Sequence, residues 1–184
     1  MAFWQLILGI GWLLVPAYLS NMSPPIIAKI VGGRWAWPVD FCLSWKGKRI
    51  LGDHKTIRGF VAGTLLGVLA GLFQGSLAGT AFVKSIQLVD YASINGALLG
   101  ALLGFGALLG DSVKSFFKRR VGIRPGGRWI PFDQIDFVIG AFLLIWPLAP
   151  LSWQVWLLAL ALHPALTIGV KHLGYYIGIN DEKW

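Results

Sequence analysis

The stretch that decides the fold is GFVAGTLLGVLAGLFQGSLAGTAFV, residues 59–83, in which 25 consecutive positions carry no charged side chain. A bilayer core about 30 Å thick needs roughly 20 apolar residues in a helix, so this stretch is long enough to cross it. Of the 184 residues in the chain, 56% are hydrophobic and 13% are charged, and the mean hydropathy is +0.68. Soluble domains average about 25% charged residues, so the composition predicts an integral membrane protein.

Further apolar segments predict the rest of an all-α bundle. The prolines in Trp146-Pro147-Leu148-Ala149-Pro150 predict a turn, because proline cannot continue a helix from inside. A cleaved signal peptide is not favoured, since the first basic residue is Lys29. The single cysteine, Cys42, excludes an intrachain disulfide. We expect one membrane domain over residues 1–184, with five transmembrane helices at about 2–19, 59–83, 92–118, 131–149 and 152–174.

Glycines recur every fourth residue in two of these segments. Small residues at this spacing let helix backbones approach closely in lipid, where van der Waals contact replaces the hydrophobic driving force. The pattern predicts that the second and third helices pack face to face, or that they pack against a copy in a homodimer. The glycines are Gly63, Gly67, Gly71, Gly75 and Gly79 in one segment, and Gly96, Gly100 and Gly104 in the other.

The basic residues indicate the orientation of the bundle. They gather in two regions, the predicted loop at about 20–58 and the segment from Lys114 through the predicted loop at about 119–130, whereas Lys84 falls on the other side. Positively charged loops stay on the cytoplasmic side of a membrane. We therefore expect a multi-pass cell-membrane protein with its N-terminus outside, two long cytoplasmic loops and a cytoplasmic C-terminus.

One charged stretch lies between apolar segments: GDSVKSFFKRRVGIRPGGRWIPFDQID, residues 110–136. If the third helix continues through its start, Asp111, Lys114, Ser115 and Lys118 recur at steps of three and four and share one helix face. A simple alternative is that Asp111 only pairs with Lys114 or Lys118 at the helix end. Charged groups near a bilayer are costly unless they face a partner or a polar cavity.

A pair of acids opens the fourth predicted helix. Pro131 suits a first helical position, and Asp133 and Asp136 then lie three residues apart, pointing the same way. Each acid alone could cap the helix and complement its dipole. As a pair matched by Asp111, they are typical of ligands for a hard cation such as Mg²⁺, which one or two carboxylates hold together with substrate phosphates.

Basic and glycine residues complement these acids. The first loop ends in GDHKTIRG, residues 52–59, next to the second helix. A glycine pair lets backbone amides approach phosphate oxygens, and the bases can neutralise a polyphosphate. A surface for anionic lipid would need no aspartates, so the sequence predicts a metal–nucleotide site. Its expected phosphate-binding residues are Asn21, Asp53, Lys55, Thr56, Arg58, Lys114, Ser115, Lys118, Arg119, Arg124, Gly126, Gly127 and Arg128.

The order of these motifs is familiar. Gly110-Asp111, Ser115, Lys118-Arg119, the Gly126-Gly127 loop and Asp133-x-x-Asp136 follow one another, and Lys55-Thr56-Ile57-Arg58-Gly59 precedes them. Over residues 52–136 the chain resembles integral-membrane CTP:phosphatidate cytidylyltransferases, with Gln134 where that family has arginine. The small size and five spans are most similar to its archaeal branch, the CDP-archaeol synthases.

This resemblance implies a reaction. CTP would react with a membrane lipid phosphate, 2,3-di-O-geranylgeranylglycerol 1-phosphate, to give a CDP-archaeol-type lipid and pyrophosphate in phospholipid biosynthesis, with no nucleic-acid partner. The lipid phosphate would attack the α-phosphorus of CTP, a transfer that needs mainly positioning and charge neutralisation. We assign catalytic roles to Asp111, Asp133, Asp136 and Lys118, and Mg²⁺ as cofactor, held by Asp111, Asp133 and Asp136.

Other classes of protein fit less well. A small transporter or channel for an anionic substrate would carry ionisable residues within its spans, yet the acids cluster at one face. A CDP-alcohol phosphotransferase would carry D-G-x-x-A-R, which does not occur in this sequence. A structural protein with a basic lipid-binding face remains an alternative. His163 lies inside the last span, where a helix-to-helix hydrogen bond is favoured over a proton relay.

Overall fold

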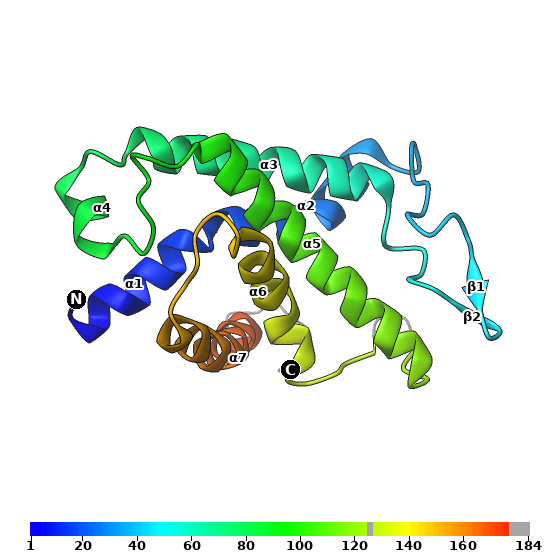
Figure 1. Cartoon of the computed structure of the whole chain (residues 1–184). Coiled ribbons are helices and arrows are strands. Elements are labelled where there is room, and N and C mark those ends of the chain that lie inside the picture. The colour runs from blue at the N-terminus through cyan, green and yellow to red at the C-terminus, as the bar shows by residue number, and fades with distance from the viewer. Residues whose placement is uncertain (125–126, 177–184) are drawn as a thin grey trace.

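The computed structural model describes residues 1–124 and 127–176, and in these ranges the chain is almost entirely helical (Figure 1). The only sheet in these ranges is a hairpin of two short antiparallel strands, β1 (Ser44–Trp45) and β2 (Lys48–Arg49). The helices are α1 (Phe3–Leu13), α2 (Val15–Val31), α3 (Ile57–Ser76), α4 (Ala81–Ile86), α5 (Gly96–Arg120), α6 (Phe132–Ile145) and α7 (Trp153–Tyr176).

Helix α5 is the centre of the bundle and contacts α2, α3 and α6 (Figure 1). Where α5 meets α3 the two backbones touch: a Cβ atom on Gly100 would lie 2.1 Å from the carbonyl oxygen of Gly67, and one on Gly71 would lie 2.1 Å from that of Gly96. The predicted face-to-face packing is therefore confirmed within one chain. The homodimer alternative stays a prediction. Gly79 lies beyond the end of α3 and takes no part in this contact.

Glycines also set the contact between α5 and α6. A Cβ atom on Gly110 would lie 2.1 Å from the carbonyl oxygen of Asp136, and one on Gly140 would lie equally close to that of Gly106. Any side chain at these positions would push the helices apart. The charged end of α5 and the first turns of α6 are thus held in direct contact.

The first predicted helix, about 2–19, is instead two helices that meet at an angle of 42°. Pro16 is the cause, because it has no N–H to donate to the carbonyl of Trp12 and proline bends a helix. The side-chain amide of Gln74 on α3 donates to that carbonyl at 2.5 Å. A neighbouring helix thus supplies the hydrogen bond that the bend removes.

Helix α2 continues to Val31, so the predicted first loop begins about twelve residues later than expected. The helix contains two internal prolines, Pro24 and Pro25. Pro24 leaves the carbonyl of Ser20 without its usual donor, and the hydroxyl of Ser23 donates to that oxygen at 2.9 Å. A local side chain therefore replaces the missing backbone donor.

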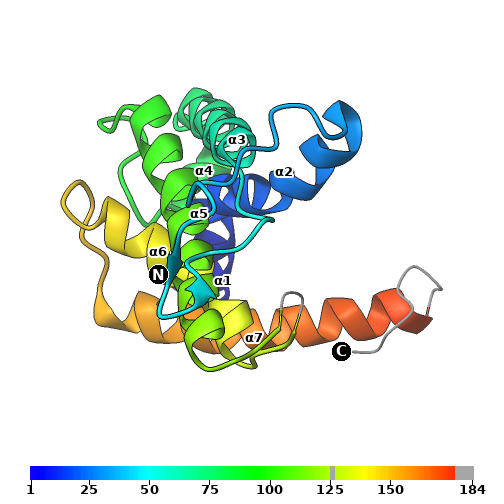
Figure 2. The same ribbon diagram turned by 90° about the vertical axis from the view of Figure 1, so that its right-hand side faces the viewer.

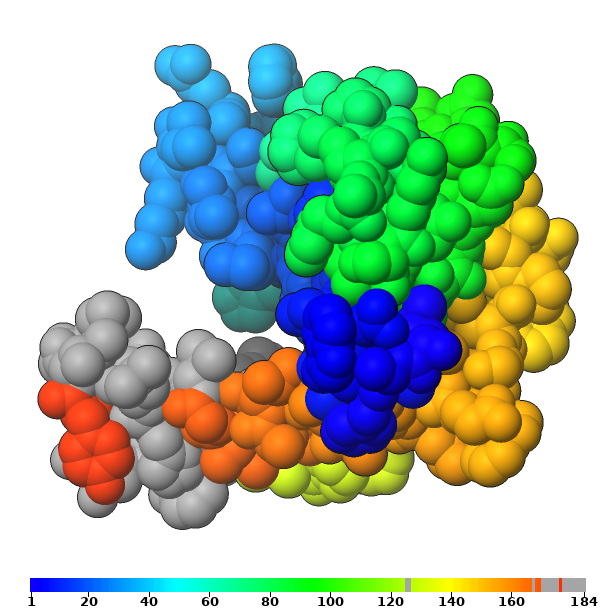
Figure 3. Space-filling view, turned by 90° about the vertical axis from the view of Figure 1, so that its left-hand side faces the viewer, coloured from blue at the N-terminus to red at the C-terminus, as the bar shows by residue number. Residues whose placement is uncertain are grey.

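The second predicted helix, about 59–83, is also divided. Helix α3 ends at Ser76, and the short α4 begins after Thr80, whose hydroxyl oxygen accepts a hydrogen bond from the amide of Val83 at 3.3 Å. Such a cap favours a new helix start over continuation. Figure 3 shows α1 lying between this α3–α4 region and α7, on the face opposite the hairpin.

The remaining helices lie close to the predicted spans, with the expected turn between Trp146 and Ser152. In the described part of the chain, α3 and α5 are long and apolar enough to cross a membrane, and the bent pair α1–α2 is a third candidate. Helix α6 and the apolar part of α7, Trp153–Leu166, are shorter. The fold is thus an intramembrane helical bundle.

His163 connects α7 to α2. Its Nδ1 lies 2.6 Å from the carbonyl oxygen of Ala159, which can only accept, so Nδ1 carries the proton. Its Nε2 therefore accepts the hydrogen bond from the hydroxyl of Tyr18. The predicted helix-to-helix hydrogen bond is confirmed. Figure 2 shows that the C-terminal part of α7 extends beyond the rest of the bundle.

Candidate active site

The candidate active site lies where the charged end of α5 meets the start of α6. Asp111, Lys114 and Lys118 occupy one face of α5, as their spacing predicts. The first turns of α6 present Asp133 and Asp136 to this face, because the glycine contact brings the two helices together there.

Lys114 lies at the centre of three carboxylates. Its Nζ is 2.9 Å from an oxygen of Asp111, 3.2 Å from one of Asp133 and 2.6 Å from one of Asp136. The side chains of Lys114 and Asp136 are 13% and 6% exposed, so this contact lies largely out of water. The predicted gathering of the three acids is confirmed, and the simple pairing of Asp111 with Lys114 also occurs.

Two further lysines complete the charge balance. Lys55 forms an ion pair with the second oxygen of Asp111, and Lys118 lies 2.6 Å from Asp133. The backbone amide of Trp129 donates to the other oxygen of Asp133 at 2.6 Å. Three lysines therefore neutralise three aspartates, as buried charges require. We call this set, Lys55, Asp111, Lys114, Lys118, Asp133 and Asp136, the acid–lysine cluster.

Lys55 comes just before α3, and its surroundings shift the pKa of its ammonium group. Burial, which is the largest cause, and the charges of Lys114 and Lys118 outweigh the opposing effect of Asp136 and Asp133, and the net result is to lower the pKa of its ammonium from the usual 10.5 to about 8. An added anion next to Lys55 would favour its charged form. A bound phosphate would therefore hold this ammonium in its charged form.

Two polar cavities adjoin the cluster. The first, which we call the lysine cavity, has a volume of about 240 Å³ and is lined by residues including Lys55, Asp111, Lys114, Ser115, Lys118 and Arg119. The second, the proline cavity, has about 350 Å³ and is lined by residues including Asn21, Pro24, Pro25, Thr56, Arg58 and Phe60. Asp53, His54, Lys55 and Asp111 line both cavities, so the two are neighbours.

An apolar groove lies on the other side of Lys114. This α5–α6 groove has a volume of about 530 Å³ and is lined by apolar side chains including Val113, Phe117, Phe132, Ile139 and Leu143. Lys114 and Asp136 are its charged lining residues. Lys114 therefore lines both the groove and the lysine cavity. A polyphosphate in the cavity and an amphiphile in the groove can reach the same ammonium.

The predicted residues of the first loop lie around the cavities, and several have structural partners. The hydroxyl of Thr56 caps α3 by accepting from the amide of Gly59 at 3.3 Å. Arg58 donates to the carbonyl oxygens of Gly32, at 2.5 Å, and of Arg34. Asp53 is exposed and pairs with Arg49 at 2.7 Å. These contacts fix the loop, and the residues that make them also line the cavities.

The remaining predicted residues are divided between the cavity and the loop after α5. Ser115 lines the lysine cavity, but its hydroxyl donates to the carbonyl of Asp111 at 2.8 Å. Arg124 and Arg128 are exposed on the loop and line neither cavity. The amide of Gly127 donates to the carbonyl of Arg124 at 2.9 Å, and Gly126 lies outside the described residues.

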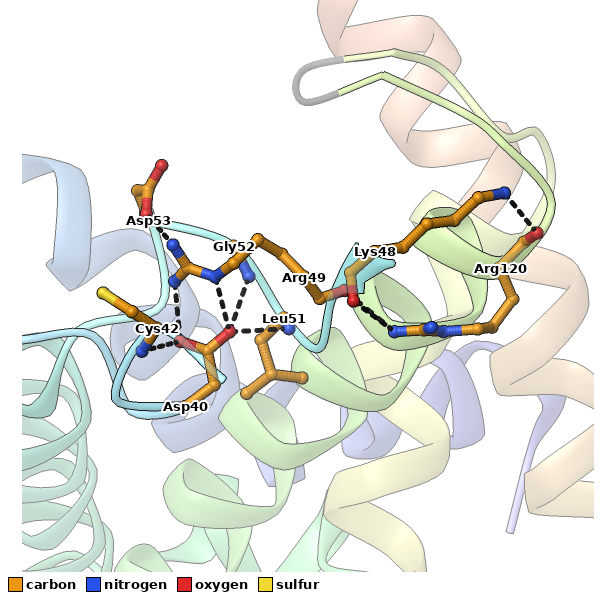
Figure 4. Close-up of polar contacts among 8 residues, drawn as sticks. All are labelled: Asp40, Cys42, Lys48, Arg49, Leu51, Gly52, Asp53 and Arg120. Atoms are coloured by element: carbon orange, nitrogen blue, oxygen red, sulfur yellow. Dashed lines mark hydrogen bonds and ion pairs between the residues drawn. The ribbon is translucent and has the colours of Figure 1, made fainter. Parts of the chain in front are cut away.

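Sequence reasoning missed a network in the first loop. Asp40, Arg49 and Arg120 connect this loop to the end of α5 (Figure 4). Arg49 and Arg120 are 71 residues apart, so no local spacing indicates their contact. The one signal in the sequence is Asp40 itself, an acid among apolar and aromatic residues. It belongs to no motif, so its role could not be predicted.

The donor set suits a cation that also takes ligands from a substrate. Across residues 1–124 and 127–176, no three Asp, Glu, His or Cys side chains are placed to hold a metal by themselves. The carboxylate oxygens instead converge on the Lys114 ammonium. Mg²⁺ is commonly bound by one or two carboxylates plus phosphates and water, so these oxygens fit that ion in the presence of a nucleotide.

Apolar helices that enclose a charged cluster with adjoining cavities are typical of an intramembrane enzyme. A solved structure described as an intramembrane enzyme for archaeal membrane lipid biosynthesis matches this fold with a TM-score of 0.63 and 32% sequence identity. The match covers 86% of this chain and 90% of that one.

The sequence comparisons define the family. The family profile described as CarS-like CDP-archaeol synthase matches residues 3–184. The CDP-archaeol synthases of Methanospirillum hungatei and Methanoregula boonei are 40% and 41% identical to this chain, each over 93% of it and 100% of the relative. That of Thermococcus gammatolerans is 37% identical over 99% of this chain and 96% of the relative. The chain belongs to the CDP-archaeol synthase family.

Membership establishes the activity. The protein is a CTP-dependent cytidylyltransferase of membrane-lipid biosynthesis, which transfers CMP from CTP to a lipid phosphate. The expected function is confirmed, and the transporter alternative is wrong.

Proposed function

We propose that the acid–lysine cluster is the catalytic centre of this transfer and that Asp111, Asp133 and Asp136 bind Mg²⁺ together with CTP. The observation that carries the proposal is the Lys114 ammonium, which lies 2.6–3.2 Å from oxygens of all three acids. Those oxygens face one point and already hold one positive charge. A bound Mg²⁺ would neutralise charge on the triphosphate and on the leaving pyrophosphate.

Substrate binding then becomes an exchange of partners. The three acids and three lysines neutralise one another. Asp111, Asp133 and Asp136 would hold the cation that accompanies a nucleotide, and the lysines would then take the phosphates as their partners. Each buried charge keeps an opposite charge nearby, which avoids the penalty of an unpaired one.

The residues of the cluster position the reacting groups. Lys55, Lys118 and Arg119 bind the triphosphate from the lysine cavity, and Lys114 contacts phosphate from both substrates. The acceptor phosphate is an anion at neutral pH, so the transfer needs orientation and charge neutralisation rather than a general base. Asn21, Thr56 and Arg58 line the adjoining proline cavity, which extends the site away from the groove.

The α5–α6 groove binds the tails of the lipid acceptor. Its lining is apolar except at Lys114 and Asp136, so an amphiphile in the groove directs its phosphate toward the cluster. Leu143, whose surface is 60% exposed, opens the groove to the surrounding lipid. The acceptor therefore reaches the site from the side.

The metal assignment is testable by binding as well as by turnover. With CTP present, Mn²⁺ used as a paramagnetic probe is expected to bind, and Asp133→Asn should weaken that binding by about tenfold or more. Electron paramagnetic resonance of free and bound Mn²⁺ gives the affinity directly. Chelation should stop cytidylyl transfer and Mg²⁺ should restore it. Equal Mn²⁺ affinity in the variant and the parent protein would contradict the assignment.

We further propose that the chain crosses the cell membrane five times, with the bent pair α1–α2 as one pass and the N-terminus outside. The excess of bases in the first loop and after α5 supports this orientation. Cys42 is exposed in the first loop and is the only cysteine. A membrane-impermeant maleimide should label it in inverted vesicles and not in intact cells, with Cys42→Ser as the blank. Labelling of intact cells would reverse the orientation.

A further inference from the structure

Asp40 is the buried anchor of the first loop. Its side chain is 1% exposed, and its carboxylate accepts from Nη2 of Arg49 at 2.7 Å and from the backbone amides of Leu51 at 2.9 Å and Gly52 at 3.2 Å (Figure 4). The amide of Cys42 donates at 3.2 Å to the same oxygen that accepts from Arg49 Nη2, whereas Leu51 and Gly52 donate to the other oxygen. This one carboxylate therefore ties together the two ends of the segment that contains the hairpin.

The charge of Asp40 is secured by these contacts. Burial alone would raise the pKa of its carboxyl group, but the hydrogen bonds from Arg49, Leu51, Gly52 and Cys42 outweigh it and lower the pKa to about 2. The carboxylate is thus ionised throughout the physiological range, and its bonds to the loop are charge-assisted.

Arg120 attaches the hairpin to the end of α5. Its guanidinium donates to the carbonyl oxygens of Trp45 at 2.5 Å and of Arg49 at 2.8 Å. The same group lies over the rings of Trp45 and Phe116, 5.2 Å and 4.8 Å from their centroids. In return, Nζ of Lys48 donates to the carbonyl of Arg120 at 3.1 Å. Hydrogen bonds and cation–π contacts thus fasten the hairpin to the helix that carries Asp111 and Lys114.

The segment held in this way forms one side of the lysine cavity. Arg49, Leu51, Gly52 and Lys55 line that cavity. Lys55 is held from its backbone too, since its carbonyl accepts from the amide of Val39 at 2.7 Å, next to Asp40. The chain from Asp40 to Lys55 is therefore tied at its start, its middle and its end.

We propose that Asp40, Arg49 and Arg120 are positioning residues for CTP: they fix the loop so that Lys55 and its neighbours face Asp111 before the nucleotide arrives. This inference rests on the proposed active site, because it assigns the polyphosphate to the lysine cavity. A preformed cavity saves the cost of ordering the loop on binding. Loss of the network should therefore weaken CTP binding and leave the binding of the lipid acceptor, on the other side of Lys114, unchanged.

The test compares Asp40→Asn and Arg120→Gln with the parent protein in steady-state assays with both substrates varied. Each variant is expected to raise KM for CTP about tenfold, the effect of one lost charge-assisted contact, while KM for the lipid stays within about twofold. Asp90→Asn is the matched control. That carboxylate also accepts from a nearby hydroxyl and a backbone amide, of Ser93 and Ala92, but it lies before α5, far along the chain from the cluster. Its KM for CTP should not change.

The reaction rate of the Cys42 thiol gives a second measurement, which does not depend on enzyme turnover. Because its amide is bonded to Asp40, loosening the network should speed the reaction of its exposed thiol with a disulfide reagent. We expect faster modification in Asp40→Asn and Arg120→Gln, with CTP slowing the reaction in the parent protein. Asp90→Asn should react at the parent rate.

The outcomes separate the possible failures. An unchanged KM for CTP in both variants would overturn the positioning role, as would an equal rise in KM for both substrates, which indicates general loss of structure. If Asp40→Asn does not fold, Arg120→Gln at the end of α5 decides the question. Near-normal turnover in Asp111→Asn would instead mean that the active-site assignment itself is wrong.

Discussion

Asp111→Asn and Asp133→Asn are each expected to reduce cytidylyl transfer by about 10³-fold, or about 4 kcal/mol of transition-state stabilisation. Each substitution keeps the shape of the side chain and removes one negative charge from the acid–lysine cluster. Asp111 is the partner of both Lys55 and Lys114, and Asp133 is the partner of Lys114 and Lys118. The loss therefore affects both the cation and the lysines that orient phosphate.

A radiolabelled-CTP assay that follows the CDP-lipid measures this effect. Asp90→Asn makes the same chemical change in a loop before α5 and should retain full activity. Size-exclusion profiles of all variants should match, because α5 and α6 are held by glycine contacts that these substitutions leave in place. Near-normal turnover by both cluster variants would contradict the assignment of Asp111 and Asp133.

Leu143→Trp is expected to raise KM for the lipid acceptor by about tenfold or more, which corresponds to at least about 1.4 kcal/mol. Leu143 lines the α5–α6 groove and is 60% exposed, so an indole ring has room to occupy the groove without disturbing the core. A bulky side chain in a binding groove competes with the ligand for the same volume. KM for CTP should stay unchanged, since the lysine cavity lies on the other side of Lys114.

Leu69→Trp is the control for this change. Leu69 is 60% exposed on α3 and does not line the groove, so its substitution adds the same bulk to another lipid-facing surface. Mixed-micelle assays at varied acceptor concentration distinguish the two variants. Equal KM values for the acceptor in Leu143→Trp and Leu69→Trp would show that the tails bind elsewhere.

Helical periodicity predicts which residues of the candidate site share a helix face. Asp111, Lys114 and Lys118 are separated by steps of three and four residues, so they share one face of any helix that contains them. Asp133 and Asp136 are likewise neighbours in any helix that begins at Pro131 or Phe132. The central place of Lys114 could not be predicted, because it depends on how closely α5 and α6 approach. That distance is set by Gly110 and Gly140, and the sequence does not indicate which helix each of them contacts.

The fold was predicted less completely where tertiary contacts override local signals. The first helix is predicted to end at about residue 19, yet the side chains of Ser23 and Gln74 replace backbone donors that the prolines lack, and the segment stays helical to Val31. The Asp40–Arg49–Arg120 network joins distant parts of the chain through carbonyl oxygens, which have no sequence signature. Such contacts become visible only in three dimensions.

Lys114 borders both the lysine cavity and the apolar α5–α6 groove, so one side chain lies at the boundary between a charged region and an apolar one. A nucleotide can stay dissolved in water and a lipid can keep its chains in the bilayer while their phosphates meet at one nitrogen atom. Neither reactant has to be carried into the other's phase. On the proposed assignment of the two substrates, their phosphates would meet at the side chain of Lys114.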